Sequence, residues 1–223
     1  MIKGAIFDMD GTLTDSMHIW SSVGPNYLRS VGCCPRDDVS ATVRSMSLYQ
    51  GACYYRDEYK VPLSAEEIML GINKIVEELY MTDTVLKPGV KEFVSELYKK
   101  NIKLCIATAT DRYLVEKLLE KLDILEYFSQ IFTCGDIGHG KDEPIIYREA
   151  IKFLGTDKSE TVIFEDALYA LSTAKNDGFL AAAVYDKYEK RPDEMKRLAD
   201  VYMMDFYDTQ EFWYFANKTK QII

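Results

Sequence analysis

The sequence predicts an α/β protein in which a doubly wound parallel sheet is interrupted near its start by an all-helical cap domain. Short apolar runs typical of buried strands recur along the chain, and segments with helical spacing follow them. Such alternation implies a parallel sheet with helices on both faces. One long stretch, residues 16–84, breaks the alternation and has helical spacing throughout. The 223 residues suffice for a core domain with such an insertion.

Six apolar runs are expected to form the strands, because each is short and bounded by polar or turn-forming residues. The last of them is an expected edge strand. The runs span residues 5–7, 103–107, 131–133, 161–164, 180–184 and 201–203.

Helices are expected between these runs, where apolar side chains recur every three or four residues. Two of the helical patterns stop at glycines, Gly155 and Gly178, which are typical residues after a helix end. The four expected buried faces consist of Val90, Phe93, Val94 and Leu97; of Leu114, Leu118 and Leu122; of Ile145, Ile146, Ala150 and Phe153; and of Ala170 and Ala174.

The cap is predicted to span residues 16–84, and the core residues 1–15 and 85–223. Ser64 and Glu67 have the spacing of a capping box and indicate a helix start after Pro62. The segment is rich in aromatic residues, and we expect its tyrosines to fill the interior of the cap. The aromatic residues are Trp20, Tyr27, Tyr49, Tyr54, Tyr55 and Tyr59.

Composition excludes several classes of partner. The formal net charge of −9 opposes binding to nucleic acid or to an anionic membrane. No stretch has the length needed to cross a bilayer. The 5 cysteines have no spacing typical of a zinc site or a disulfide framework, so we expect reduced thiols, the adjacent Cys33 and Cys34 included, in a cytoplasmic protein. We expect a monomer.

Polar residues follow three of the expected strands. Asp8 and Asp10 follow the first, Thr108 the second, and Glu165 with Asp166 a later one. In a doubly wound sheet, ligands bind outside the carboxyl ends of the strands. These side chains are therefore expected to meet at one edge of the sheet and to form the functional site.

The segment Asp-Met-Asp-Gly-Thr-Leu-Thr-Asp, from Asp8 to Asp15, resembles the signature of the haloacid dehalogenase (HAD) superfamily. The later elements resemble it in order and spacing: Thr108, then Lys141, then Glu165 with its acidic neighbour. The resemblance covers residues 1–15 and about 87–212, and implies a HAD-type Rossmann-like core. The insertion after Asp15 is similar to the helical-cap subclass, which includes β-phosphoglucomutase and many sugar-phosphate phosphatases.

Chemistry explains the two aspartates of the first loop. Asp8 is suited to attack phosphorus and to form a covalent aspartyl-phosphate. Asp10 lies two residues further and points the same way if the strand stays extended. It is thus expected near the leaving oxygen, as general acid and later as general base.

A carboxylate needs a cation beside it to approach an anionic phosphate ester. The resemblance implies Mg²⁺ held by the Asp8 side chain, the Asp10 backbone carbonyl and Asp166, with Glu165 in a supporting position. An aspartate-rich oxygen donor set of this kind suits that ion.

The transferring phosphoryl group needs fixed donors as well. The Thr108 hydroxyl, the backbone N–H of Ala109 and the ammonium group of Lys141 are the candidates. Each of these residues alone has a simpler interpretation, such as a helix cap or a surface lysine. The functional interpretation depends on their occurring together in this order.

Substrate choice is expected to lie in the cap, since inserted caps close over such sites and exclude water. His18 and Trp20 follow the first core loop and are candidates for lining the entrance. Arg44 lies in an expected inter-helix loop, where it either contacts substrate or is a solvated charge.

The leading functional hypothesis is a magnesium-dependent phosphatase of a small phosphorylated metabolite. The alternative is a phosphomutase of the β-phosphoglucomutase kind, in which the phosphoryl group of Asp8 returns to a sugar instead of to water. A non-catalytic phosphate-binding module is disfavoured because Asp10 and Asp166 are both present. A phosphonate hydrolase would need a Schiff-base lysine in the cap, and nothing marks Lys60 or Lys74 for that role.

Overall fold

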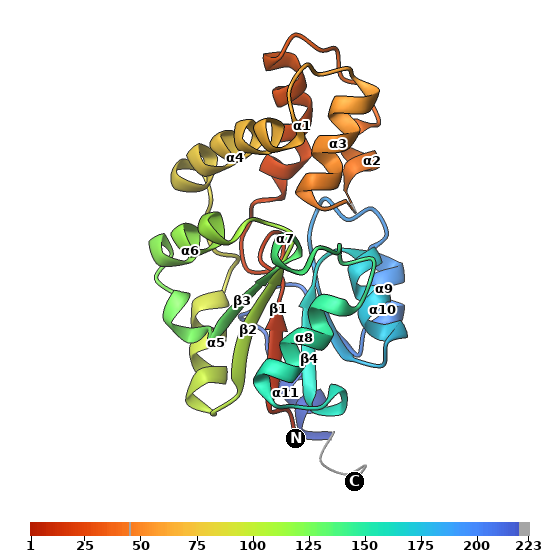
Figure 1. Cartoon of the computed structure of the whole chain (residues 1–223). Helices are drawn as coiled ribbons and strands as arrows, with labels where there is room; N and C mark the ends of the chain where they lie inside the picture. Colours follow the sequence, from red (N-terminus) through yellow and green to blue (C-terminus); the bar gives the residue numbers. More distant parts are fainter. Residues whose placement is uncertain (45, 219–223) are drawn as a thin grey trace.

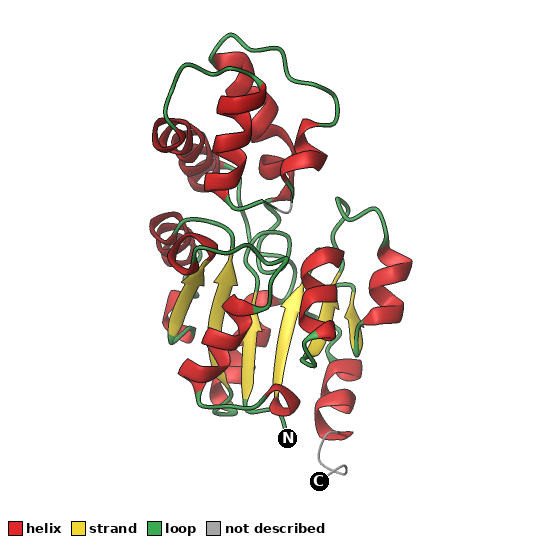
Figure 2. Ribbon diagram, turned by 45° about the vertical axis from the view of Figure 1, so that its right-hand side comes forward, coloured by secondary structure: helices red, strands yellow, loops and turns green. Residues whose placement is uncertain are grey.

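The computed structural model describes residues 1–44 and 46–218. A six-stranded parallel sheet runs through this part of the chain in the order β3-β2-β1-β4-β5-β6 (Figures 1 and 2). The strand order reverses beside β1, as it does in a doubly wound fold. The predicted fold class is thus confirmed, and the all-helical insertion lies above the carboxyl ends of the strands (Figure 1).

Each of the predicted strands is present, with bounds that differ by one residue at most. Their side chains are almost wholly buried, which is typical of parallel strands covered on both faces. The strands are β1 (Gly4–Phe7), β2 (Lys103–Thr108), β3 (Gln130–Thr133), β4 (Thr161–Glu165), β5 (Leu180–Val184) and β6 (Val201–Met203).

The helices fall into a cap set and a core set. The cap set consists of α1 (Met17–Ser30), α2 (Val39–Val43), α3 (Leu48–Glu58) and α4 (Ala65–Thr82). The core set consists of α5 (Val90–Lys99), α6 (Arg112–Lys121), α7 (Cys134–Ile137), α8 (Ile145–Leu154), α9 (Leu168–Asn176), α10 (Pro192–Leu198) and α11 (Gln210–Lys218), with the short 3-10 turns η1 (Leu125–Tyr127) and η2 (Lys158–Glu160). Among the helices described, none is long and apolar enough to cross a membrane.

Alternate residues of the central strands face opposite helical layers. On one face, the rings of Phe7 and Phe164 stack with centroids 4.2 Å apart and pack with residues of α5, α6 and α11. On the other face, Ile6 and Ile163 pack against Tyr147 and its neighbours on α8. This packing fixes β1 beside β4 and therefore fixes the loops that leave their carboxyl ends.

One predicted core position is wrong. Phe153 was expected on the buried face of its helix, but 51% of the residue is exposed. The buried face of α8 is rotated instead toward Tyr147 and Leu154. The ring of Phe153 forms a T-shaped pair with that of Phe132, from the outermost strand β3, at a centroid distance of 5.9 Å.

The capping box predicted at the start of α4 is confirmed. The Ser64 hydroxyl accepts a hydrogen bond from the backbone N–H of Glu67, and the Glu67 carboxylate accepts one from the backbone N–H of Ser64. Tyr27 and Tyr55 are buried in the cap, as expected for its tyrosines. Tyr49 is half exposed instead, because it lies on the outer side of α3.

Two backbone segments that lie side by side connect the cap to the core. The Asp15 N–H donates to the Val85 carbonyl over 3.0 Å, and the Lys87 N–H donates to the Leu13 carbonyl over 2.9 Å. Thr14 forms an antiparallel bridge with Leu86 between them. These bonds support our proposal that the chain divides after residue 15 and again after residue 84.

Candidate active site

The sheet register brings the polar strand ends together. Phe7 of β1 is paired with Phe164 of β4, and the Asp8 N–H donates to the Phe164 carbonyl over 3.0 Å. Asp8 and Glu165 therefore leave adjacent strands at the same level. Thr108 ends β2, which lies on the other side of β1.

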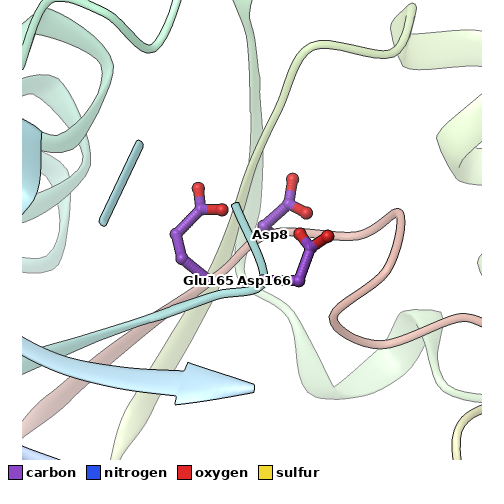
Figure 3. Close-up of side chains that lie close together, drawn as sticks. All are labelled: Asp8, Glu165 and Asp166. Carbon is purple, nitrogen blue, oxygen red and sulfur yellow. The ribbon is translucent and has the colours of Figure 1, made fainter. Parts of the chain in front are cut away.

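The carboxyl groups of Asp8, Glu165 and Asp166 form a buried cluster (Figure 3). One oxygen of each lies within 4.8 Å of one oxygen of the others. Three carboxylates this close repel one another unless protons or a cation neutralise them. Asp166 Oδ2 is buried and has no hydrogen-bond partner among the described residues, and it would be satisfied if it coordinated a bound cation. The donor set is all oxygen, which suits Mg²⁺.

The ammonium group of Lys141 is a buried cation in the site. It donates hydrogen bonds to Asp8 Oδ1 and, over 2.7 Å, to Glu165 Oε1. The Tyr147 hydroxyl donates to the same Glu165 oxygen over 2.8 Å. Burial opposes the charge on Lys141, but the two carboxylates outweigh burial and raise the pKa of Lys141 well above its usual value. Lys141 is therefore a permanent positive charge at the base of the site.

Asp8 and Asp166 ionise with difficulty in this setting. Burial raises the pKa of Asp8 to about 6, against the opposing charge of Lys141 and with the added repulsion of Glu165. Burial, followed by the charges of Asp8 and Glu165, also raises the pKa of Asp166 well above its usual value. A divalent cation between these groups would reverse the effect by favouring their ionised forms.

Asp10 is held by residues that the sequence analysis did not identify. Its Oδ1 accepts hydrogen bonds from the Ser16 hydroxyl and the Tyr80 hydroxyl, each over 2.6 Å. Its Oδ2 accepts one from the Thr110 hydroxyl over 2.7 Å. Trp20 Nε1 donates to the Tyr80 oxygen over 3.0 Å and extends the network into the cap. Burial and the neighbouring Asp8 raise the pKa of Asp10.

A cavity of about 400 Å³ lies between the cap and this group of residues. Most of the predicted site residues line it, and Trp20 does too. His18 was predicted to line the entrance as well, but it is not among the described residues that line the cavity. The predicted site residues in the lining are Asp8, Asp10, Arg44, Thr108, Ala109, Lys141, Glu165 and Asp166.

Arg44 lines the cavity, but its guanidinium group is bonded to the core. One nitrogen donates to the Tyr188 carbonyl over 3.0 Å and another to Glu189 Oε2 over 3.3 Å. The same Glu189 oxygen accepts the backbone N–H of Leu168 over 3.1 Å. Arg44 thus links the cap to the loop beyond Asp166, and substrate recognition by Arg44 stays a prediction.

Residues 5–184 match the model of the haloacid dehalogenase-like hydrolase family. Since the match spans more than half of the chain and both acidic strand ends, the chain belongs to this family. The chain is a phosphoric monoester hydrolase, the class of its named relatives.

Two curated relatives are phosphatases. Hexitol phosphatase B of Escherichia coli strain K12 is 26% identical over 159 residues, which are 70% of this chain and 71% of the relative. A phosphorylated carbohydrates phosphatase of Thermotoga maritima is 24% identical over 146 residues, which are 66% and 68% of the two chains. The crystal structure of CbbY from Rhodobacter sphaeroides in complex with phosphate is similar in fold, with a TM-score of 0.83, 22% identity and coverage of 94% of this chain and 97% of that one.

Proposed function

We propose that this enzyme is a magnesium-dependent phosphatase of a small phosphorylated metabolite and works through an aspartyl-phosphate on Asp8. The observation that supports this most strongly is the buried group formed by three carboxylates and Lys141 at the ends of β1 and β4. Three carboxyl groups this close repel one another and destabilise the fold. A purely structural role therefore does not explain the arrangement, whereas a metal-dependent reaction does.

In the first step, a carboxylate oxygen of Asp8 attacks phosphorus, and the bond from phosphorus to the alcohol oxygen breaks. Asp10 gives its proton to that leaving oxygen. Burial, followed by the charge of Asp8, raises the pKa of Asp10 and so favours the acid form that this role needs. In the second step a water molecule attacks the aspartyl-phosphate, Asp10 takes its proton, and the bond between phosphorus and the Asp8 oxygen breaks.

Lys141, Thr108 and Ala109 are proposed to hold the phosphoryl group. Lys141 contacts Asp8 directly, so its charge lies beside the attacking oxygen. Thr108 and Ala109 line the same cavity from the end of β2. Removing one such donor typically lowers turnover by about 10²–10³-fold.

The side chains of Asp8 and Asp166, together with the Asp10 carbonyl, would hold Mg²⁺, with Glu165 supporting Lys141. The ion supplies charge neutralisation that lets the carboxylate of Asp8 approach an anionic ester. The unpartnered Oδ2 of Asp166 fits this assignment.

A substitution at Gly11 tests whether Asp166 is a ligand of Mg²⁺. Its φ of +84° suits glycine, and a Cβ there would lie 2.4 Å from Asp166 Oδ2. We expect Gly11→Ala to weaken Mg²⁺ binding and to lower kcat/KM at least about tenfold, beyond a backbone strain of about 1 kcal/mol. The control is Gly32→Ala, with a φ of +80° but no atom within 4 Å of the new Cβ. Equal Mg²⁺ affinity in the two variants would contradict the assignment of Asp166.

The proposed function is tested by a panel of phosphorylated metabolites with Mg²⁺, scored for released phosphate. The names of the relatives suggest hexitol phosphates and other phosphorylated carbohydrates as the first members of the panel. We expect phosphate release that EDTA abolishes and that excess Mg²⁺ restores. A folded, metal-loaded protein that releases no phosphate from any member would overturn the proposal.

The phosphomutase alternative is decided by following the sugar phosphates of the same panel for isomerisation, with and without a bisphosphate primer. A mutase would isomerise a sugar phosphate and would need a bisphosphate primer, whereas a phosphatase passes the phosphoryl group to water.

We propose further that the protein acts as a monomer in the cytoplasm. The free thiols of all 5 described cysteines support a reducing compartment.

A further inference from the structure

The cavity above Asp8 has two ends of different chemistry. The core end carries the carboxylates and Lys141, which suit a phosphoryl group. The opposite end belongs to the cap and receives whatever alcohol the phosphate is attached to. If the proposed phosphatase function holds, the chemistry of the cap end decides which class of alcohol the enzyme accepts.

The cap end of the cavity is built mainly from apolar side chains. Each cap helix contributes one branched aliphatic residue to the lining: Val23 from α1, Val43 from α2, Leu48 from α3 and Ile72 from α4. The ring of Trp20 adds to the same wall. Four helices thus present aliphatic side chains to one cavity, and this cap-side surface is called the cap wall.

The polar atoms of this wall are largely bonded to the protein itself. The Ser21 hydroxyl donates to the His18 carbonyl over 2.9 Å, and the Ser40 hydroxyl donates to the Ser21 carbonyl over 2.8 Å. Trp20 Nε1 donates to Tyr80, and the Arg44 guanidinium donates to the core loop. These donors are consequently not free to meet hydroxyl groups of a substrate.

Tyr55 also lines the cap side of the cavity. Tyr55 is buried against Gly24, where an added Cβ would lie 2.2 Å from the tyrosine oxygen. The Tyr55 and Ser47 hydroxyls are polar groups of the cap wall, and the Ser47 oxygen accepts the Gln50 N–H over 3.2 Å. Tyr188 and Lys190 add polar groups to the lining from the core. A polyol with four or five hydroxyl groups would need several partners there, and each unmet hydrogen bond weakens binding.

We propose that the enzyme prefers phosphomonoesters of compact apolar alcohols, with an aromatic ring or a branched alkyl group, over polyol phosphates. The volume of about 400 Å³ lies in the range of small-molecule sites. Burial of the ring or alkyl group against the four aliphatic side chains supplies the binding energy, and the phosphoryl group anchors it at Asp8.

The test compares benzyl phosphate with glucitol 6-phosphate under saturating Mg²⁺. Both esters leave a primary alkyl oxygen, so the comparison reports on the cavity rather than on the reactivity of a phenol. We expect kcat/KM to be at least about tenfold higher for benzyl phosphate.

A pair of variants shows whether the cap wall is responsible. Leu48→Asn makes the wall polar at the first residue of α3. It should lower the ratio of kcat/KM for benzyl phosphate to that for glucitol 6-phosphate about tenfold. Leu63→Asn is the matched control, because Leu63 is also a partly buried cap leucine but does not line the cavity. It should leave the ratio of the two substrates unchanged.

The outcomes separate the two proposals. Magnesium-dependent hydrolysis with equal rates for both esters, or with the polyol ester preferred, overturns the inference and leaves the phosphatase function standing. An equal effect of Leu48→Asn and Leu63→Asn on the ratio also overturns it. No hydrolysis of either ester or of any panel member overturns the phosphatase function and the inference together.

Discussion

Asp8→Asn is expected to lower phosphate release by about 10³-fold or more while the protein stays folded. The amide has nearly the shape of the carboxylate but cannot attack phosphorus, and it is a poor ligand for Mg²⁺. Single removal of a covalent nucleophile typically has an effect of this size or larger. Lys141 keeps its second carboxylate partner, Glu165, so it is not left unpaired. Initial rates of phosphate release measure the effect, with thermal unfolding as the check on folding.

Asp15→Asn is the matched control for this variant. Asp15 ends the same motif, but 44% of its side chain is exposed and its ion-pair partner, Lys187, lies 3.7 Å away at the surface. An exposed pair of this kind contributes little. We expect the control to keep nearly full activity. A fall of less than about tenfold in Asp8→Asn would contradict the covalent mechanism.

Lys141→Met is expected to affect both stability and turnover. The side chain of Lys141 is 3% exposed and contacts two buried carboxylates. Without it, Asp8 and Glu165 lose their shared cation, and we expect the free energy of unfolding without metal to fall by about 3–5 kcal/mol. Turnover should fall by about 10²–10³-fold, because a charge at the phosphoryl group is lost. Urea unfolding with EDTA and steady-state kinetics with Mg²⁺ measure the two effects.

Two further variants separate charge from packing. Lys141→Met with Glu165→Gln removes one of the stranded carboxylates and should recover part of the lost stability, but not the turnover. Lys190→Met removes an exposed lysine from the rim of the same cavity and should change neither quantity by much. A Lys141→Met protein as stable as the wild type would show that Lys141 does not balance the buried carboxylates.

The sequence allowed prediction of the sheet and of the acidic strand ends because both depend on local patterns. Buried parallel strands are apolar throughout, so the residues where Asp8 and Glu165 interrupt them stand out. The carboxyl ends of parallel strands share one edge, so their convergence follows from the fold class. The capping box at Ser64 is equally local.

What could not be predicted depends on contacts distant along the chain. Tyr80 meets Asp10 from 70 residues away, and only the angle between α4 and the core brings the two together. Tyr147 occurs in an apolar helical pattern that gives no indication of a hydrogen bond to Glu165. Arg44 faces the cavity, yet its partners lie on a core loop 144 and 145 residues further on. Phe153 fits the helical spacing, yet it packs against Phe132 of the outermost strand β3 and stays half exposed.

The central claim is that Asp8 points at phosphorus beside one divalent cation that it shares with Asp166. A crystal structure with Mg²⁺ and beryllium fluoride, a mimic of the phosphoryl group, tests it most directly. We predict beryllium bonded to an Asp8 oxygen, and one Mg²⁺ at about 2.0–2.1 Å from oxygens of Asp8 and Asp166. Fluoride bound away from Asp8, or a metal ion that does not touch Asp166, would contradict the account.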